Sequence, residues 1–87
     1  MKIKKGFVVR EIAGQCIVVA LGETSKTFHG MIKLNETGKI IWSMLEKGSD
    51  VDTIVSYIVG EYDATADTVR SDVERFIDTL NSANILE

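Results

Sequence analysis

The segment from residue 33 to residue 42 reads KLNETGKIIW and marks a change from extended to helical structure. An extended apolar segment ends at Leu34, and a helical pattern of Ile and Trp residues follows. Asn35 lies between them, where its side-chain oxygen can accept a hydrogen bond from the backbone N–H of Thr37 or Gly38. The junction therefore predicts a strand that ends at Leu34 and a helix that begins one residue after Asn35.

The residues before this junction read as strands. The runs at 7–12 (FVVREI) and 16–21 (CIVVAL) are rich in β-branched and apolar residues, and 13–15 is a short turn between them. This arrangement predicts a hairpin. Residues 22–27 (GETSKT) read as a loop. A third, shorter strand is predicted within 28–34.

Side chains alternate in direction along the predicted third strand. One side would carry Phe28, Ile32 and Leu34. The other would carry His29, Met31 and Lys33. If this strand pairs along one side only, its free edge presents unpaired N–H and C=O groups that can accept a strand from another chain. An outward Lys33 could instead serve only to protect that edge from aggregation.

The residues after the junction read as three helices. Ile40, Ile41, Met44 and Leu45 give the first its apolar face. Ser49 is the expected N-cap of the second helix, and Thr65 that of the third. The apolar stripe of the third helix is Val69, Val73, Phe76, Ile77 and Leu80. Val69, Val73, Phe76 and Leu80 are expected at the centre of its core face. The terminal Ile85 and Leu86 can fold back onto the core.

The element order predicts an α+β domain of winged-helix type, in which a three-stranded antiparallel sheet precedes three helices (β-β-β-α-α-α). The 87 residues are expected to form a single domain, residues 1–87. The longest apolar run has six residues, too few to span a membrane. With one cysteine and no recognisable signal peptide, we expect a cytoplasmic location.

The sequence contains few residues that could support catalysis. The chain has one cysteine, Cys16, and one histidine, His29. Cys16 falls within an apolar strand, where a buried thiol is unreactive. Metal sites need several Cys, His or clustered carboxylate ligands. The sequence therefore predicts neither an enzyme nor a metal site, and it predicts no cofactor.

The charge distribution argues against nucleic acid. Residues 1–47 carry eight Lys or Arg against four Glu, whereas residues 48–87 carry two Arg against nine acidic residues. The third helix is thus acidic, although a recognition helix that approaches phosphates usually carries Lys or Arg. A DNA-binding winged helix is the alternative that this observation disfavours.

Three segments carry a resemblance to a known family: Lys33–Gly38 (KLNETG), Val51–Val55 (VDTIV) followed by Glu61–Asp63 (EYD), and Val69–Phe76 (VRSDVERF). Their order and spacing resemble the PqqD family, pyrroloquinoline quinone biosynthesis protein D and its relatives, over roughly residues 5 to 87.

The resemblance implies a peptide chaperone of the kind called a RiPP recognition element, where RiPP means a ribosomally synthesised and post-translationally modified peptide. Such domains bind the leader segment of a precursor peptide and present it to a modifying enzyme, often a radical S-adenosylmethionine protein. The leader adds to the third strand and packs against the third helix. No membrane and no nucleic acid is implied.

Carried onto this sequence, the family's peptide-binding residues fall on two elements. The strand residues are Phe28, His29, Gly30, Met31, Ile32 and Lys33. The helix residues are Asp72, Arg75, Phe76 and Thr79. Either the backbones of His29, Met31 and Lys33 or those of Gly30 and Ile32 face the open edge. A structural domain in which an identical chain fills that edge, as in a homodimer, is a further alternative.

Overall fold

The protein has a three-stranded antiparallel sheet in the order β1-β2-β3, with β2 at its centre. The strands span Phe7–Ile12, Gln15–Ala20 and Ile32–Leu34. This arrangement is seen in a computed structural model that describes residues 2–26 and 31–87. The predicted hairpin of the first two strands is confirmed, and β3 adds to the far side of β2.

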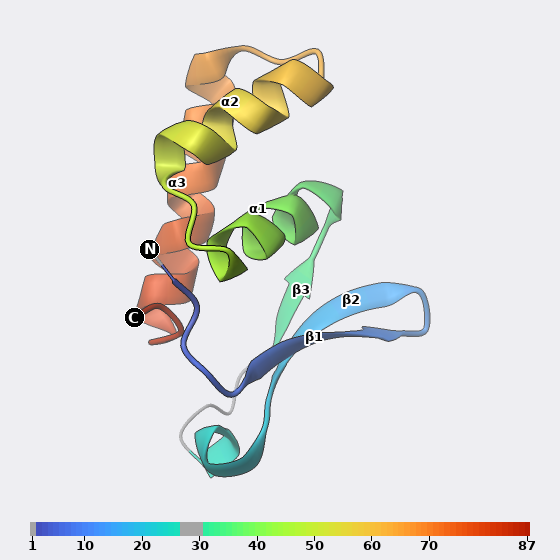
Figure 1. Cartoon of the computed structure of the whole chain (residues 1–87). Coiled ribbons are helices and arrows are strands. Elements are labelled where there is room, and N and C mark those ends of the chain that lie inside the picture. The colour runs from blue at the N-terminus through green and yellow to red at the C-terminus, as the bar shows by residue number, and fades with distance from the viewer. Residues whose placement is uncertain (1, 27–30) are drawn as a thin grey trace.

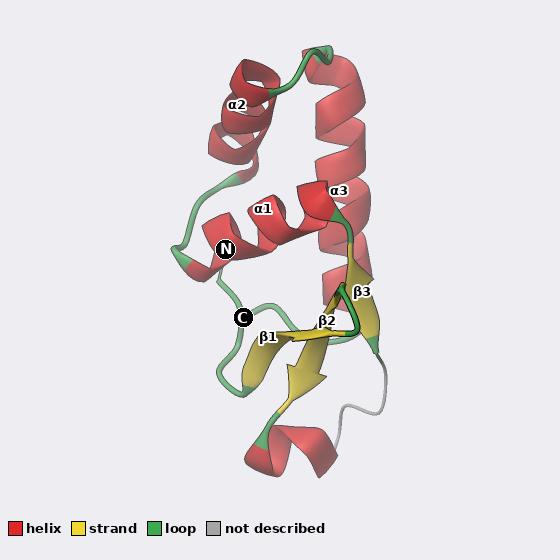
Figure 2. Ribbon diagram, turned by 90° about the vertical axis from the view of Figure 1, so that its right-hand side faces the viewer, coloured by secondary structure: helices red, strands yellow, loops and turns green. Residues whose placement is uncertain are grey.

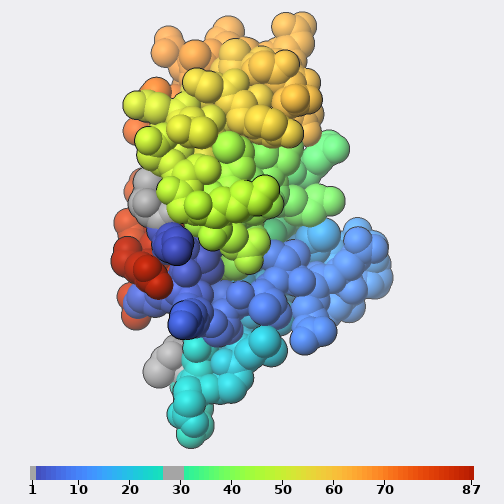
Figure 3. All heavy atoms as spheres, viewed as in Figure 1, coloured from blue at the N-terminus to red at the C-terminus, as the bar shows by residue number. Residues whose placement is uncertain are grey.

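The hairpin turn is one residue shorter than the sequence suggested. Only Ala13 and Gly14 form it, with φ of 53° and 79°, as the tightest hairpin turns require. Gln15 therefore belongs to β2, and Leu21 lies beyond it. The segment that reads as a loop forms a short 3-10 helix, η1, over Gly22–Lys26. Figure 3 shows it as a protrusion below the hairpin.

Three helices follow β3, with bounds Glu36–Glu46 for α1, Val51–Glu61 for α2 and Ala66–Ser82 for α3. In Figures 1 and 2, α1 lies over one face of the sheet. Helix α2 and the long helix α3 lie on the same side of the sheet as α1. The α+β, winged-helix-like arrangement of a sheet followed by three helices is therefore confirmed.

Side-chain hydrogen bonds start all three helices. The N–H of Gly38 donates to Asn35 Oδ1 at 2.7 Å, and the N–H of Thr68 donates to Thr65 Oγ1 at 3.3 Å. Both caps are those that the sequence predicted. The prediction of Ser49 for α2 is wrong, because Asp50 accepts from the N–H of Thr53 at 2.8 Å.

The hydrogen bond from the Thr53 N–H lowers the pKa of the Asp50 carboxyl. The charged form of Asp50 is therefore favoured in the folded chain. Its contribution to stability is present above the ordinary pKa of an aspartate and is lost as the pH falls through the lowered value.

The core lies between the sheet and the helices. Its fully buried side chains are Val18, Ile41, Trp42, Leu45, Ile54, Val73, Leu80 and Ile85. The C-terminal residues return to this core as expected, since Ile85 and Leu86 are buried. The N-terminal segment pairs with them: Ile3 bridges Leu86, and the N–H of Lys4 donates to the Ile85 carbonyl at 2.8 Å.

The core face of α3 differs from the expectation at one position. Val69, Val73, Ile77 and Leu80 are its buried residues. Phe76 is only partly buried against the core, so its placement at the centre of that face is corrected. Ile77, which also belongs to the predicted apolar stripe, is buried instead. The ring of Phe76 is left at the edge of the core.

We expect Asn35→Ala to lower the free energy of unfolding by about 1 kcal/mol, because the N–H of Gly38 loses its acceptor. Urea denaturation measures this. Asn35→Asp is the matched control, since aspartate caps helices equally well. Equal stability of the alanine variant and the wild type would show that the cap does not hold the start of α1.

Candidate functional site

The register of the sheet decides which backbone groups of β3 face outward. In an antiparallel pair, residues that exchange hydrogen bonds alternate with residues that do not. The N–H of Leu21 donates to the Gly6 carbonyl at 2.7 Å, and the two-residue turn pairs Ile12 with Gln15. Both observations place the hydrogen-bonding pairs of β1 and β2 at every second residue, and one of these pairs is Arg10 with Ile17.

Cys16 and Val18 therefore turn their backbone groups toward β3, where their partners are Leu34 and Ile32. Lys33, opposite Ile17, turns its N–H and C=O away from the sheet. By the same alternation, the backbone of Ile32 faces inward. Among the described residues, the register thus favours the predicted set that contains Lys33 over the set that contains Ile32.

The side chains of the third strand lie as the alternation predicts where the structure describes them. Leu34 is buried and Ile32 half-buried on the core side, whereas Met31 and Lys33 are exposed. β3 itself spans only Ile32–Leu34. Of the predicted binding residues, Phe28, His29 and Gly30 lie outside the described residues.

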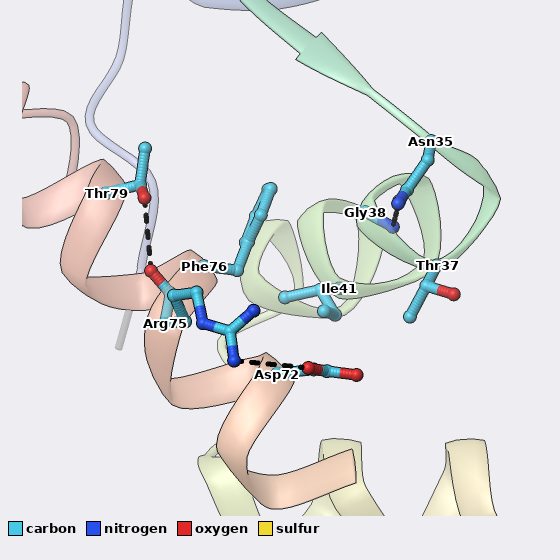
Figure 4. A pocket seen from close by; sticks show the side chains of 8 residues that line it. All are labelled: Asn35, Thr37, Gly38, Ile41, Asp72, Arg75, Phe76 and Thr79. Carbon is cyan, nitrogen blue, oxygen red and sulfur yellow. Dashed lines mark hydrogen bonds and ion pairs between the residues drawn. The ribbon is translucent and has the colours of Figure 1, made fainter. Parts of the chain in front are cut away.

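An open pocket of about 320 Å³ begins where β3 ends and lies between α1 and α3 (Figure 4). From α1 and its cap, the pocket is lined by Asn35, Thr37, Gly38 and Ile41. From α3, it is lined by Asp72, Arg75, Phe76 and Thr79. The floor is apolar through Phe76 and Ile41, and the rim is polar and charged.

Gly38 brings the three elements of the pocket together. A methyl group at this position would lie 3.5 Å from Phe76 of α3 and 3.6 Å from Leu34 at the end of β3. It would also come within 3.1 Å of Asn35 Oδ1, which is closer than most side chains tolerate. The distances to Phe76 and Leu34 are ordinary van der Waals contacts, so the absence of a side chain at Gly38 mainly leaves room for the Asn35 cap.

The polar groups on the α3 side are weakly engaged within the protein. Arg75 Nη2 lies 3.8 Å from Asp72 Oδ1, and the two side chains are 75% and 54% exposed. The Thr79 hydroxyl donates to the Arg75 carbonyl at 3.1 Å. An exposed ion pair of this length contributes little to stability. Arg75 and Asp72 are therefore available to a bound ligand.

The structure thus brings together the four helix residues that the sequence singled out, and it places them beside the end of β3. Sequence reasoning missed the α1 side of the pocket, namely Asn35, Thr37, Gly38 and Ile41. A glycine three residues after a helix cap, where alanine would favour the helix, was the available signal. The approach of α1 to α3 is a tertiary contact that no local pattern reveals.

Among the described residues, no three His, Cys, Asp or Glu side chains gather as a metal site would require. Cys16 is half-buried, not fully buried as expected, and packs against the core. Asp67, Asp72, Glu74 and Asp78 of α3 are exposed.

Within the described ranges 2–26 and 31–87, no helix has the length and apolar character to cross a bilayer. The cytoplasmic location expected from the sequence stays a prediction.

Comparison with known proteins agrees with this geometry. The family model described as coenzyme PQQ synthesis protein D (PqqD) matches residues 15–86, and the chain belongs to the PqqD family. No curated protein matches the chain. Among solved structures, the chain is similar to "TbiB1 in Complex with the TbiA(beta) Leader Peptide". The identity is 30% with a TM-score of 0.78, and the match covers 100% of this chain and 95% of that one.

We expect Asp72→Asn to change the free energy of unfolding by less than about 0.5 kcal/mol, because its ion pair with Arg75 is long and exposed. Chemical denaturation measures the difference from the wild type. Ser71→Asn, at the neighbouring exposed position of the same helix, is the control for adding an amide. A loss well above 1 kcal/mol would mean that Asp72 serves the fold and is not free for a ligand.

Proposed function

We propose that this protein is a RiPP recognition element that binds the leader segment of a ribosomally made precursor peptide. The observation that carries the proposal is the free edge of β3 at Lys33, which leads directly into the pocket between α1 and α3. Membership of the PqqD family and the similarity to a protein solved with a leader peptide support it.

In this proposal the leader binds as a fourth strand. Its backbone exchanges hydrogen bonds with the N–H and C=O of Lys33, and of Met31 by continuation of the same alternation. Side chains that face the core side of the sheet then enter the pocket, over Phe76 and Ile41. The peptide backbone supplies affinity, and the pocket selects among side chains.

The protein acts by presentation, not by chemistry of its own. A modifying enzyme, which in this family is often a radical S-adenosylmethionine protein, would act on the segment that follows the bound leader. Whether the product is pyrroloquinoline quinone or another modified peptide depends on the precursor encoded beside this gene. A homodimer that fills the same edge would compete with the leader, so peptide binding should dissociate it.

The first test is a titration of the isotopically labelled protein with the leader segment of a precursor peptide encoded beside its gene. We expect backbone amide shifts to concentrate at 31–41 and 72–79, because these residues form the edge and both sides of the pocket. Shifts spread over α2, or no binding to any neighbouring precursor, would overturn the proposal.

We expect Lys33→Pro to weaken leader binding by about fivefold or more, because it removes one outward N–H and places a ring on the edge. The fold should survive, since this N–H does not face β2. Fluorescence anisotropy of a labelled leader measures the affinity.

The matched control is Glu11→Pro. Glu11 lies on β1 at the opposite edge of the sheet, and the register turns its N–H away from β2 in the same way. Its replacement should leave leader affinity unchanged. If both prolines weaken binding equally, or if only Glu11→Pro does so, the peptide does not add to β3.

A further inference from the structure

Lys33 occupies a row of facing residues that crosses the sheet. Arg10 of β1 lies opposite Ile17 of β2, and Ile17 lies opposite Lys33 of β3. Residues that face one another across strands project on the same side of the sheet. The alternation along β3 places Lys33 on the side away from the core, since Ile32 and Leu34 face the core.

The charges on this outer side are both positive. Among the described strand residues that project there, Arg10 and Lys33 are the charged ones, and the others are Val8, Ile12, Gln15, Ile17 and Val19. Glu11 projects on the opposite side. No carboxylate from the described strand residues therefore offsets Lys33 on its own face.

Lys33 is also without an ionic partner in the described part of the chain, whose ion pairs are Lys26 with Glu23, Arg70 with Asp52 and Arg75 with Asp72. A shallow pocket beside Lys33 is lined by one acid, Glu36, and a second cation, Lys39. Glu36 and Lys39 offset each other, so this pocket keeps the single positive charge of Lys33, whose side chain is exposed.

A peptide strand that pairs with β3 would add a fourth residue to the row of Arg10, Ile17 and Lys33. The residue that exchanges backbone hydrogen bonds with Lys33 would project on the same outer side, with its Cβ about 5 Å from that of Lys33. The next residue on either side would project toward the core side, where the pocket over Phe76 and Ile41 lies. One face of the added strand would therefore lie beside the charged Lys33, and the other would lie toward the apolar floor of the pocket.

From this arrangement we infer that Lys33 selects a carboxylate in the bound peptide. The preferred ligand is a segment in which an Asp or Glu faces Lys33 and the next residue is apolar and enters the pocket. The inference rests on the proposed strand addition and goes beyond it, because binding through the backbone alone requires no charge in the peptide.

The experiment starts from random-sequence peptides displayed in a library and selected on the wild-type protein. Peptides that bind the Lys33→Gln variant but not the Lys33→Pro variant are kept, because these depend on the backbone edge of β3 and not on the ammonium alone. The tightest is synthesised with Asp, Asn or Lys at each position in turn. Titration calorimetry gives the affinity of each for the wild type and for Lys33→Glu.

We expect one peptide position at which Asp binds the wild type about two- to fivefold more tightly than Asn, the range measured for single exposed or cross-strand charge pairs. At that position Lys33→Glu should reverse the order, so that Lys binds more tightly than Asp. The reversal should shrink as salt is added, because the pair is exposed. The neighbouring positions should prefer apolar residues.

Arg10→Glu is the matched control, because Arg10 lies in the same row and is separated from the added strand by β2 and β3. It should leave the charge preference of the peptide unchanged. The same preference at every position for the wild type and Lys33→Glu would overturn this inference while leaving strand addition intact. If no selected peptide is sensitive to Lys33→Pro, strand addition itself fails, and the inference fails with it.

Discussion

The hydrogen bond from the Gly38 N–H to the Asn35 side chain is the interaction on which the geometry of the site depends. It ends β3 at Leu34 and begins α1 two residues later. Asn35 and Gly38 then line the pocket at the place where the strand edge stops. Because the same residues terminate the strand, start the helix and border the pocket, the free edge and the pocket cannot shift independently.

The second constraint is the central position of β2. It pairs with β1 on one side and with β3 on the other. Among the residues that the structure describes, β3 therefore has one strand partner and one free edge. A free edge normally invites aggregation. Here it is only three residues long and carries the exposed Lys33. A short, charged edge is poorly suited to unspecific pairing and remains able to receive a peptide that also fits the adjoining pocket.

Much of this could be predicted from the sequence. The hairpin of the first two strands, the caps at Asn35 and Thr65, and the return of Ile85 and Leu86 to the core all follow from local patterns. The predicted turn of the hairpin was one residue too long. Elsewhere, local reasoning failed where two neighbouring residues were both suitable. Ser49 and Asp50 can both cap a helix, and the N–H of Thr53 is within reach of the second. Phe76 and Ile77 are adjacent on the helix, and packing against α1 leaves Phe76 at the pocket.

The sequence by itself determined the order of elements, where the strands and helices begin and end to within a residue or two, and the resemblance to the PqqD family. These depend on neighbours along the chain, through alternation, helical spacing and capping. Only the tertiary structure decided that β2 is central, that Lys33 and not Ile32 turns its backbone outward, and that α1 closes the pocket opposite Asp72 and Arg75. Each of these depends on pairing or packing between residues far apart in the sequence, and a shift of one residue in register would reverse which groups of β3 face the ligand.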